Sequence, residues 1–299
     1  MSAGVPDVAH AAELIRAGKL VAFPTETVYG LGANALDPAA VERIFAAKGR
    51  PKTSPLIVHV DSIEMARGLA AEWPAAAETL ARRYWPGPLT LVLPKRAEIP
   101  DIVTAGLPTV GLRMPGHPLA LELIRAAGVA IAGPSANRFT ELSPTTASHV
   151  PEALADYVLD GGPARVGIES TVLSLVGVPV GPPMLLRPGV ISLPEMEALI
   201  GPIRVASAPA EGAHASPGMH ERHYRPRTTL VLLRDGEALP AGRGIRAEMP
   251  ADAREYAAVL YETLHRLDAE GLDWIAIDEP PDAPEWAGVR DRLRRAAGS

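Results

Sequence analysis

The chain has 299 residues, of which 47% are apolar, and its 29 Lys and Arg against 35 Asp and Glu give a formal net charge of −6 at pH 7. This length and apolar content are typical of a globular protein with one large domain or two ordinary ones, and the negative charge argues against broad electrostatic capture of nucleic acid or of an anionic membrane. The chain has no cysteine, which excludes disulfides, zinc–thiolate sites and thiol nucleophiles.

The N-terminal region "MSAGVPDVAHAAELIRAG" carries acidic residues and lacks a basic stretch followed by an apolar run, so it does not have the pattern of a signal peptide. No apolar run approaches the roughly 20 residues that a bilayer-spanning helix needs. We therefore expect a soluble, cytoplasmic protein without a membrane partner.

The first two-thirds of the chain alternates, in part, between strand and helix patterns. A helix is expected over 7–17 with Asp7 as its N-cap and Gly18 as its stop, then a strand over 20–24. The next helix has Asp37 as cap, Pro38 in its first turn and Gly49 after its end. Short apolar runs at 55–60, 89–93, 109–115, 129–137, 156–162 and 170–176 alternate with helical stretches at 75–85 and 118–128. This pattern predicts an α/β domain with a mixed, twisted sheet.

The amino-acid composition changes at 204–227. This stretch is rich in Ala, Pro, Gly and Ser and lacks the apolar periodicity of a core-forming element, so it is predicted to be a linker. Beyond it, strands over 228–233 and 272–278, a helix over 252–269 and a last helix ending near Arg295 predict a small second α/β unit. We expect a catalytic domain over 1–203, a linker over 204–227 and a C-terminal domain over 228–299.

A cluster of positive charge follows the second helix, with Lys48, Arg50 and Lys52 close together in sequence. Taken alone, it is typical of a basic helix C-terminus that complements the helix dipole. Arg113 and Arg187, however, are flanked by strand-forming apolar residues and need an anionic partner. That partner is either a ligand or an internal carboxylate, for which Glu26 and Glu169 are the candidates.

Segments dense in hydroxyls and small residues accompany these cations: "PTET", "GPSAN", "SPTT" and "GIEST". Ser143 before Pro144 predicts a helix N-cap, and a helix N-terminus suits a phosphate oxygen. Ser135 and Asn137 follow a strand's exit, where ligands of open α/β sheets bind. Each segment alone is more often a turn or a cap, but together they indicate an oxyanion pocket.

The common phosphate and metal motifs are missing. The sequence contains no G-x-x-x-x-G-K-[ST] loop, "YGLGANA" lacks the last glycine of G-x-G-x-x-G, and "HERHY" at 220–224 has the wrong spacing for H-E-x-x-H. A nucleotide enzyme without a P-loop is the interpretation that remains.

Seven motifs occur in order: "FPTETVYGLG", "KGRP…SPLIVHV", "WPGPLTLVL", "TVGLRMPGHP", "PSANR…SPT", "DGG…GIESTVL" and "LLRPG". With them the chain resembles the YrdC/Sua5 family of L-threonylcarbamoyladenylate synthases over residues 10–200. The trailing "SPGMHERHYRP" and the C-terminal α/β unit resemble the two-domain Sua5 type. The resemblance implies a YrdC-like twisted mixed sheet with flanking helices, followed by a small Sua5-type α/β domain.

The resemblance also implies a reaction in which L-threonine, bicarbonate and ATP, with Mg²⁺ on the phosphates, give threonylcarbamoyl-adenylate and pyrophosphate. The product would feed the tRNA threonylcarbamoyl transferase machinery that modifies adenosine 37. Whether the enzyme itself touches tRNA is left open. The cationic cluster would then hold the threonine carboxylate, the carbamate and the triphosphate in one site.

The resemblance assigns roles to individual residues. L-threonine would contact Thr27, His59, Arg113, Gly133 and Ser170. ATP would contact Arg50, Ser54, Thr109, Ser135, Ser143, Arg187 and Tyr224. Lys48 and Arg50 would stabilise the charge that grows as pyrophosphate leaves.

One of these residues has an alternative role, and some positions differ in residue type from the family. His59 could instead be a satisfied core histidine. Thr53 and Ser54 stand where relatives often have Asp-Asn, and Phe139 and Thr140 where they often have Ser-Gly. The linker matches only in part, and the resemblance makes it a lid that places Tyr224 over the nucleotide.

Two other functions fit part of the pattern. A noncatalytic RNA-binding module would use a positive concave surface, but the net charge and the 4% aromatic content disfavour it. A domain that carbamoyl-adenylates from carbamoyl phosphate, as in hydrogenase maturation, would carry zinc-finger segments, which a chain without cysteine lacks.

Overall fold

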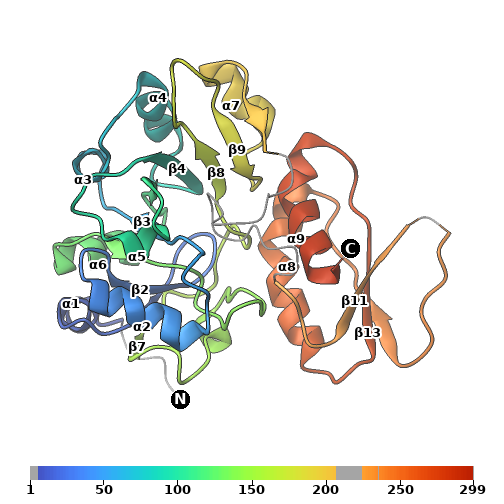
Figure 1. Cartoon of the computed structure of the whole chain (residues 1–299). Coiled ribbons are helices and arrows are strands. Elements are labelled where there is room, and N and C mark those ends of the chain that lie inside the picture. Colours follow the sequence, from blue (N-terminus) through green and yellow to red (C-terminus); the bar gives the residue numbers. More distant parts are fainter. Residues whose placement is uncertain (1–5, 207–223, 235, 299) are drawn as a thin grey trace.

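The computed structural model describes residues 6–206, 224–234 and 236–298. Within these residues ten strands form one mixed sheet (Figure 1). Its spatial order is β10 (Arg204–Val205), β9 (Met184–Arg187), β8 (Thr171–Ser174), β4 (Leu89–Pro94), β5 (Thr109–Arg113), β3 (Ile57–His59), β6 (Ile131–Ala132), β2 (Gly30–Asn34), β1 (Val21–Phe23) and β7 (Tyr157–Val158). The pairs β3–β5, β4–β8, β1–β7 and β9–β10 are parallel, and the other neighbours are antiparallel. The predicted mixed sheet is confirmed.

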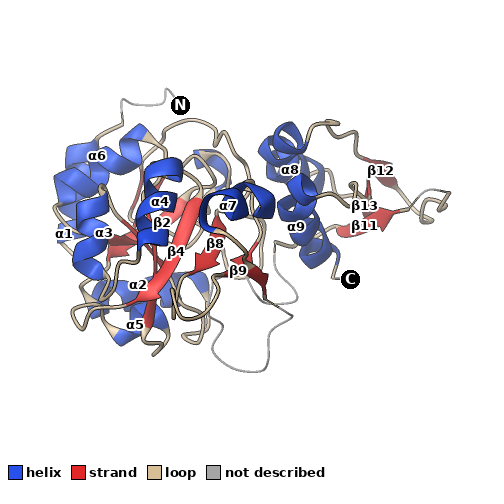
Figure 2. Cartoon of the chain, turned by 90° about the horizontal axis from the view of Figure 1, so that it is seen from above, coloured by secondary structure: helices blue, strands red, loops and turns tan. Residues whose placement is uncertain are grey.

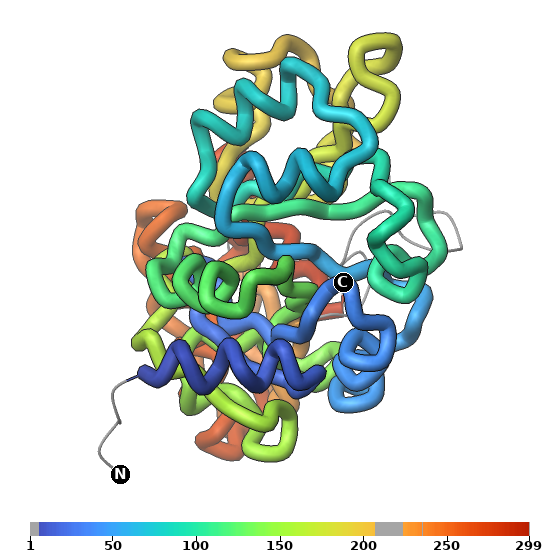
Figure 3. Tube along the Cα trace, turned by 90° about the vertical axis from the view of Figure 1, so that its left-hand side faces the viewer, coloured from blue at the N-terminus to red at the C-terminus, as the bar shows by residue number. Residues whose placement is uncertain are grey.

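Helices flank this sheet. They are α1 (Val8–Arg16), α2 (Pro38–Lys48), α3 (Ile63–Leu69), α4 (Ala75–Tyr84), α5 (Asp101–Thr104), α6 (Pro118–Ala127), the short 3₁₀ helix η1 (Ala147–His149) and α7 (Leu193–Ile200). Figure 3 shows α1 and α6 side by side on the outer face, away from the C-terminal unit, and a buried cluster joins them to β1 and β6. A larger core fills the other side of the sheet, against α2, α3 and α4.

The predicted caps of the first two helices are confirmed. Asp7 accepts a hydrogen bond from His10 N, and Asp37 accepts from Ala39 N and Ala40 N. Gly49 ends α2 in the left-handed conformation (φ 62°), which a residue with a Cβ adopts only at a cost. These local signals therefore fix where the chain turns after each helix.

A second unit follows, with β11 (Thr229–Leu233), β12 (Gly244–Arg246), α8 (Ala253–Asp268), β13 (Trp274–Asp278), the 3₁₀ helix η2 (Pro284–Trp286) and α9 (Ala287–Ala297). Its parallel strands have the order β11–β13–β12. Figures 1 and 2 show α8 and α9 between this small sheet and the larger unit. One buried cluster unites residues of α8 and α9 with Val28, Leu142 and Ile168 of the larger unit, so the two units share a core.

The 204–227 linker stays a prediction, because its residues 207–223, and with them most of the proposed lid and the histidines of "HERHY", lie outside the described residues. At its start, β10 pairs with β9 at the edge of the large sheet. Across the part of the chain that the structure describes, no helix combines the length and the apolar character needed to cross a membrane.

Candidate active site

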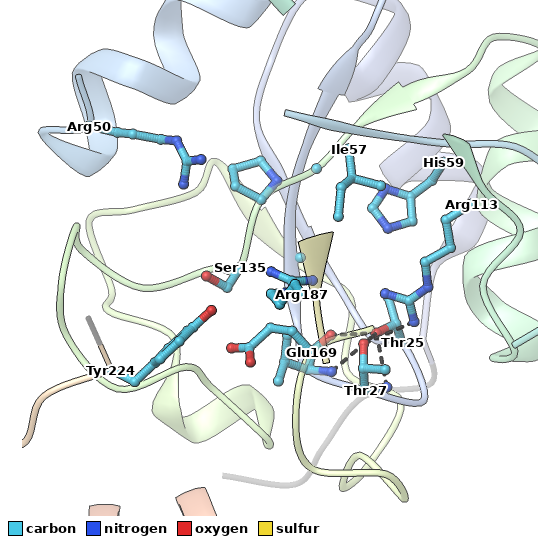
Figure 4. A pocket seen from close by; sticks show the side chains of 14 residues that line it. Thr25, Thr27, Arg50, Ile57, His59, Arg113, Ser135, Glu169, Arg187 and Tyr224 are labelled. Carbon is cyan, nitrogen blue, oxygen red and sulfur yellow. Dashed lines mark hydrogen bonds between the residues drawn. The ribbon is translucent and has the colours of Figure 1, made fainter. Parts of the chain in front are cut away.

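A pocket opens where the turn after β1, the end of α2 and the ends of β3 and β5 meet (Figure 4). Its lining residues are Thr25, Thr27, Val28, Gly30, Arg50, Ile57, His59, Arg113, Gly133, Pro134, Ser135, Glu169, Arg187 and Tyr224. Figure 4 shows Arg50, Ser135 and Tyr224 on one flank, His59, Arg113, Thr25 and Thr27 on the other, and Arg187 with Glu169 between them. The pocket thus brings together three arginines from distant parts of the chain.

On the flank of His59, Arg113 at the end of β5 is held by three contacts. Its Nη2 donates to Thr27 Oγ1 at 2.9 Å and lies 2.8 Å from Glu26 Oε1, and its Nε donates to Gly87 O at 3.3 Å. The Glu26 contact has ion-pair distance without hydrogen-bond alignment. The guanidinium is therefore preorganised at the pocket wall, where a carboxylate ligand could replace or join Glu26.

His59 lies beside Arg113 and is buried. Burial, then the charge of Arg113, lowers the pKa of His59 to about 3, so the ring is neutral at pH 7. Its Nδ1 has no hydrogen-bond partner among the described residues, and a Cβ on Gly133 would come within 3.1 Å of that atom. A buried, unpaired ring nitrogen in a pocket wall is suited to a polar ligand, so these contacts favour the ligand reading of His59.

On the opposite flank, with Ser135 and Tyr224, Arg50 Nη2 donates to Ser54 Oγ at 2.6 Å and to Pro55 O at 3.1 Å. Burial is the main cause that lowers the pKa of Arg50, to about 10, with Arg187 contributing, so Arg50 stays charged at neutral pH. Arg187 Nε and Nη2 donate to Ser170 O at 3.1 and 3.0 Å. Both guanidinium groups are fixed by oxygen atoms, which suits them to bind an anion without rearranging.

Lys48 lies behind this flank and does not line the pocket. Its Nζ donates to Ser135 O at 2.6 Å and to Asn137 O. Burial and then the nearby Arg50 lower its pKa well below the usual value. Lys48 therefore anchors the turn that carries Ser135 into the pocket. Lys52, by contrast, is exposed and pairs with Glu42 at 2.6 Å.

Glu169 closes the floor between the two flanks and is only 7% exposed. Its Oε1 accepts from Ser143 Oγ at 2.6 Å, and its Oε2 accepts from Arg292 Nε at 2.6 Å. The prediction that Ser143 caps a helix is wrong, because the chain runs without a helix from there to η1, whose N-cap is Thr146. The hydroxyl of Ser143 bonds Glu169 instead, and its main-chain oxygen bonds His265.

The structure brings most of the predicted site residues together. Those that line the pocket are Thr27, Arg50, His59, Arg113, Gly133, Ser135, Arg187 and Tyr224. Those held directly behind it are Lys48, Ser54, Ser143 and Ser170. Thr109 lies in a smaller adjoining hollow with Thr90 and Val92, and Ile57 lines both spaces.

Sequence reasoning missed part of the wall. Thr25 and Ile57 line the pocket, although "PTET" already contained a Thr two residues before Thr27. Glu169 was considered only as a partner for an arginine. Arg292 and Tyr261, which bond Glu169, come from the C-terminal unit, and no local pattern connects them with residues more than 90 positions earlier.

Comparisons with known proteins agree with this arrangement. Residues 13–189 match the Sua5/YciO/YrdC family profile, described as telomere recombination, and residues 191–298 match the profile described as threonylcarbamoyl-AMP synthase, C-terminal domain. The chain is 44% identical to the threonylcarbamoyl-AMP synthase of Pyrococcus abyssi (96% of this chain, 93% of the relative) and 40% identical to that of Bacillus subtilis (100% and 95%). The crystal structure of P. abyssi Sua5 complexed with L-threonine superposes with a TM-score of 0.89 at 41% identity, covering 97% of this chain and 94% of that one. The chain therefore belongs to the Sua5/YciO/YrdC family.

Proposed function

We propose that this protein is an L-threonylcarbamoyladenylate synthase, a nucleotidyltransferase that converts L-threonine, bicarbonate and ATP into threonylcarbamoyl-AMP, pyrophosphate and water. The observation that carries the proposal is one pocket with three buried arginines, in a chain similar over its whole length to proteins named threonylcarbamoyl-AMP synthase. Because such a reaction gathers a carboxylate, a carbamate and a triphosphate, it needs fixed positive charge on both sides of one cavity.

L-threonine binds on the flank of Arg113. The guanidinium takes the substrate carboxylate as a two-point hydrogen-bond acceptor, while Thr27, already bonded to Arg113, and the neutral His59 offer polar contacts to the rest of the amino acid. Ser170, hydrogen-bonded to Thr90 at 2.8 Å and to Arg187, joins this flank to the next.

ATP binds on the flank of Arg50, Arg187, Ser135 and Tyr224, with its base toward the hollow of Thr109. Bicarbonate and the threonine amine give a carbamate and water, and a carbamate oxygen attacks the α-phosphorus as pyrophosphate leaves. This displacement needs alignment and charge stabilisation more than a strong base. Arg50 stays charged and faces the pocket, while Lys48 contributes by holding Ser135 in place.

The pocket offers little to hold a divalent cation by itself. Glu169, which lines it, and Glu26, which lies against Arg113, are each paired with an arginine, and no group of three or more metal-binding side chains occurs in the residues that the structure describes. Mg²⁺ brought by ATP would offset the phosphate charge, and no residue of this chain is assigned to hold it.

The product is a mixed anhydride that water destroys, so a downstream enzyme must accept it. We propose that this enzyme is the tRNA threonylcarbamoyl transferase machinery that modifies adenosine 37.

A pyrophosphate-release assay tests the proposal, with L-threonine, bicarbonate or ATP omitted in turn. Release is expected only when all three are present, because the nucleophile is made from the first two. Equal release without threonine would refute the function. Replacing bicarbonate with carbamoyl phosphate separates this reaction from the carbamoyl-phosphate alternative.

A further inference from the structure

The carboxylate of Glu169 in the pocket floor is held by the C-terminal unit. Arg292 Nε, on α9, donates to Glu169 Oε2 at 2.6 Å, and Arg292 Nη2 donates to Glu169 O at 3.2 Å. The Tyr261 hydroxyl, on α8, lies 3.3 and 3.2 Å from the two carboxylate oxygens. Two helices of the second unit thus reach the wall of a pocket whose other side chains come from the first unit and from Tyr224.

Arg292 is central to this contact. Its side chain is 1% exposed. Its Nη1 donates to Pro188 O at 3.0 Å, next to Arg187, and to Asp291 Oδ2 at 2.7 Å, a carboxylate that Arg295 also pairs with at 2.9 Å. The guanidinium carbon of Arg292 lies 5.4 Å from the centre of the Tyr224 ring. Arg292 therefore contacts Glu169, Pro188 and the ring of Tyr224, all of which lie on or beside the proposed nucleotide flank.

The charge of Glu169 creates a difficulty that Arg292 resolves. Burial alone would raise the pKa of Glu169, but Arg292 and then Arg187 outweigh it and lower that pKa, so the carboxylate is charged. A charged carboxylate in the floor of an anion pocket repels phosphate and competes with it for Arg187. Arg292 holds this carboxylate from behind the wall, with Nε 2.6 Å from Oε2, and so keeps it from pairing with Arg187 instead.

We propose that Arg292 is a positioning residue of the nucleotide site. It holds the Glu169 carboxylate from the C-terminal unit and so keeps Arg187, beside Arg50, directed at the phosphates. This inference rests on the proposed function only in naming ATP as the anion. It assigns the C-terminal unit a part in substrate binding.

The test compares Arg292→Met with the unmodified full-length chain. Dissociation constants are measured by calorimetry for L-threonine and for an ATP analogue with a methylene bridge between the α- and β-phosphates. Affinity for the analogue is expected to fall on the order of tenfold, because Glu169 then relies on Arg187 as its positive partner and withdraws it from the phosphates. Threonine affinity should stay within about twofold, because threonine binds the other flank.

Three further variants show whether the effect passes through Glu169. In a Glu169→Gln background, Arg292→Met should reduce analogue affinity clearly less than in the parent, because no carboxylate is left to take Arg187 from the phosphates. Arg292→Lys keeps the charge and should recover most of the affinity. Arg290→Met is the matched control, since Arg290 lies on the same helix but pairs with Asp282 at 2.8 Å, within the C-terminal unit.

The inference fails if Arg292→Met binds the analogue as tightly as the parent, or loses affinity equally in both backgrounds. If Arg292→Met does not fold, the Glu169→Gln background decides alone, and a loss of fivefold or more there overturns the inference. A failure of the proposed function is seen separately, as absence of pyrophosphate release from the unmodified chain.

Discussion

Arg113 and Glu26 form an ion pair in the wall of the pocket, with 2.8 Å between Nη2 and Oε1 and side chains that are 5% and 6% exposed. Glu26 Oε2 also accepts a hydrogen bond from Gly116 N at 2.8 Å, just after β5. The carboxylate is therefore anchored on both oxygens and holds the arginine in place. An arginine fixed in this way is ready to receive a second carboxylate without losing side-chain entropy at the moment of binding.

We expect Arg113→Ala to raise the KM for L-threonine and to lower kcat/KM by at least about 2 kcal/mol, the usual effect of removing a charged contact in a shielded site. The measurement is pyrophosphate release at varied threonine and saturating ATP. Arg113→Ala alone also leaves Glu26 as a buried, unpaired charge, which destabilises the fold.

The double variant Glu26→Gln/Arg113→Ala separates the two effects. It should regain thermal stability relative to Arg113→Ala, because no unpaired charge remains, while its threonine KM stays high. If the double variant regained both thermal stability and the parent's KM for threonine, Arg113 would be a structural residue and not a threonine ligand.

Arg50→Ala is expected to lower kcat/KM for ATP by at least about 2 kcal/mol, since Arg50 is buried in the pocket wall and Figure 4 shows its guanidinium directed into the pocket, where we propose that the phosphates bind. Lys52→Ala is the matched control from the same positive cluster. Lys52 is exposed and pairs with Glu42 at the surface, so its removal should change activity by less than about twofold. A similar loss from both variants would mean that general positive charge, not the pocket, binds ATP.

The helix ends around the pocket could be predicted from the sequence because the signals that set them are local. Caps such as Asp37 and the left-handed Gly49 follow from the side chain and the backbone of a few neighbouring residues. The pairing of an apolar strand with a terminal arginine also predicted that Arg113 and Arg187 need anionic partners, and Glu26 was correctly named as one of them.

Features that depend on distant contacts could not be predicted in this way. Ser143 has the residue type of an N-cap, but its hydroxyl bonds Glu169, 26 positions later, and that tertiary contact outweighs the local preference. Likewise, Arg292 looks like one of several arginines on an amphipathic helix, and only the packing of α9 against the larger unit shows that it is buried.

The two units also meet at a pair of stacked histidines, which predicts a pH effect on stability. The His149 and His265 rings lie 3.9 Å apart, and His265 Nε2 is 3.1 Å from Ser143 O. Burial, and then His149, lower the pKa of His265 to about 4, although Glu262 and Asp268 oppose this shift. The unfolded chain takes up a proton on this ring near pH 6.5, and the folded chain does not. The free energy of unfolding should therefore fall by about 1 kcal/mol from pH 7.5 to 5.5 on account of His265.

Thermal unfolding of the parent and of His265→Gln at a series of pH values measures this contribution. The variant should show a flatter dependence between pH 7.5 and 5.5, because it cannot bind the proton in either state. Parallel curves would mean that this ring titrates alike in the folded and unfolded chains.

The last prediction concerns Tyr224, which has a positive φ of 62° and is 1% exposed. A tyrosine in this backbone conformation is uncommon and is kept only where surrounding contacts favour it. Its ring packs against Tyr261 and Arg292, and Figure 4 shows its hydroxyl directed toward the flank of Ser135 and Arg187. We expect Tyr224→Phe to weaken ATP binding by about 1 kcal/mol, the usual effect of one lost hydrogen bond. Tyr224→Ala should weaken ATP binding further because the pocket also loses the ring, while threonine affinity should change little, since the proposed threonine site lies on the far flank. Calorimetric titration of both variants with the ATP analogue and with L-threonine decides the matter: equal losses for both ligands would show that Tyr224 supports the fold of the pocket as a whole and does not bind the nucleotide.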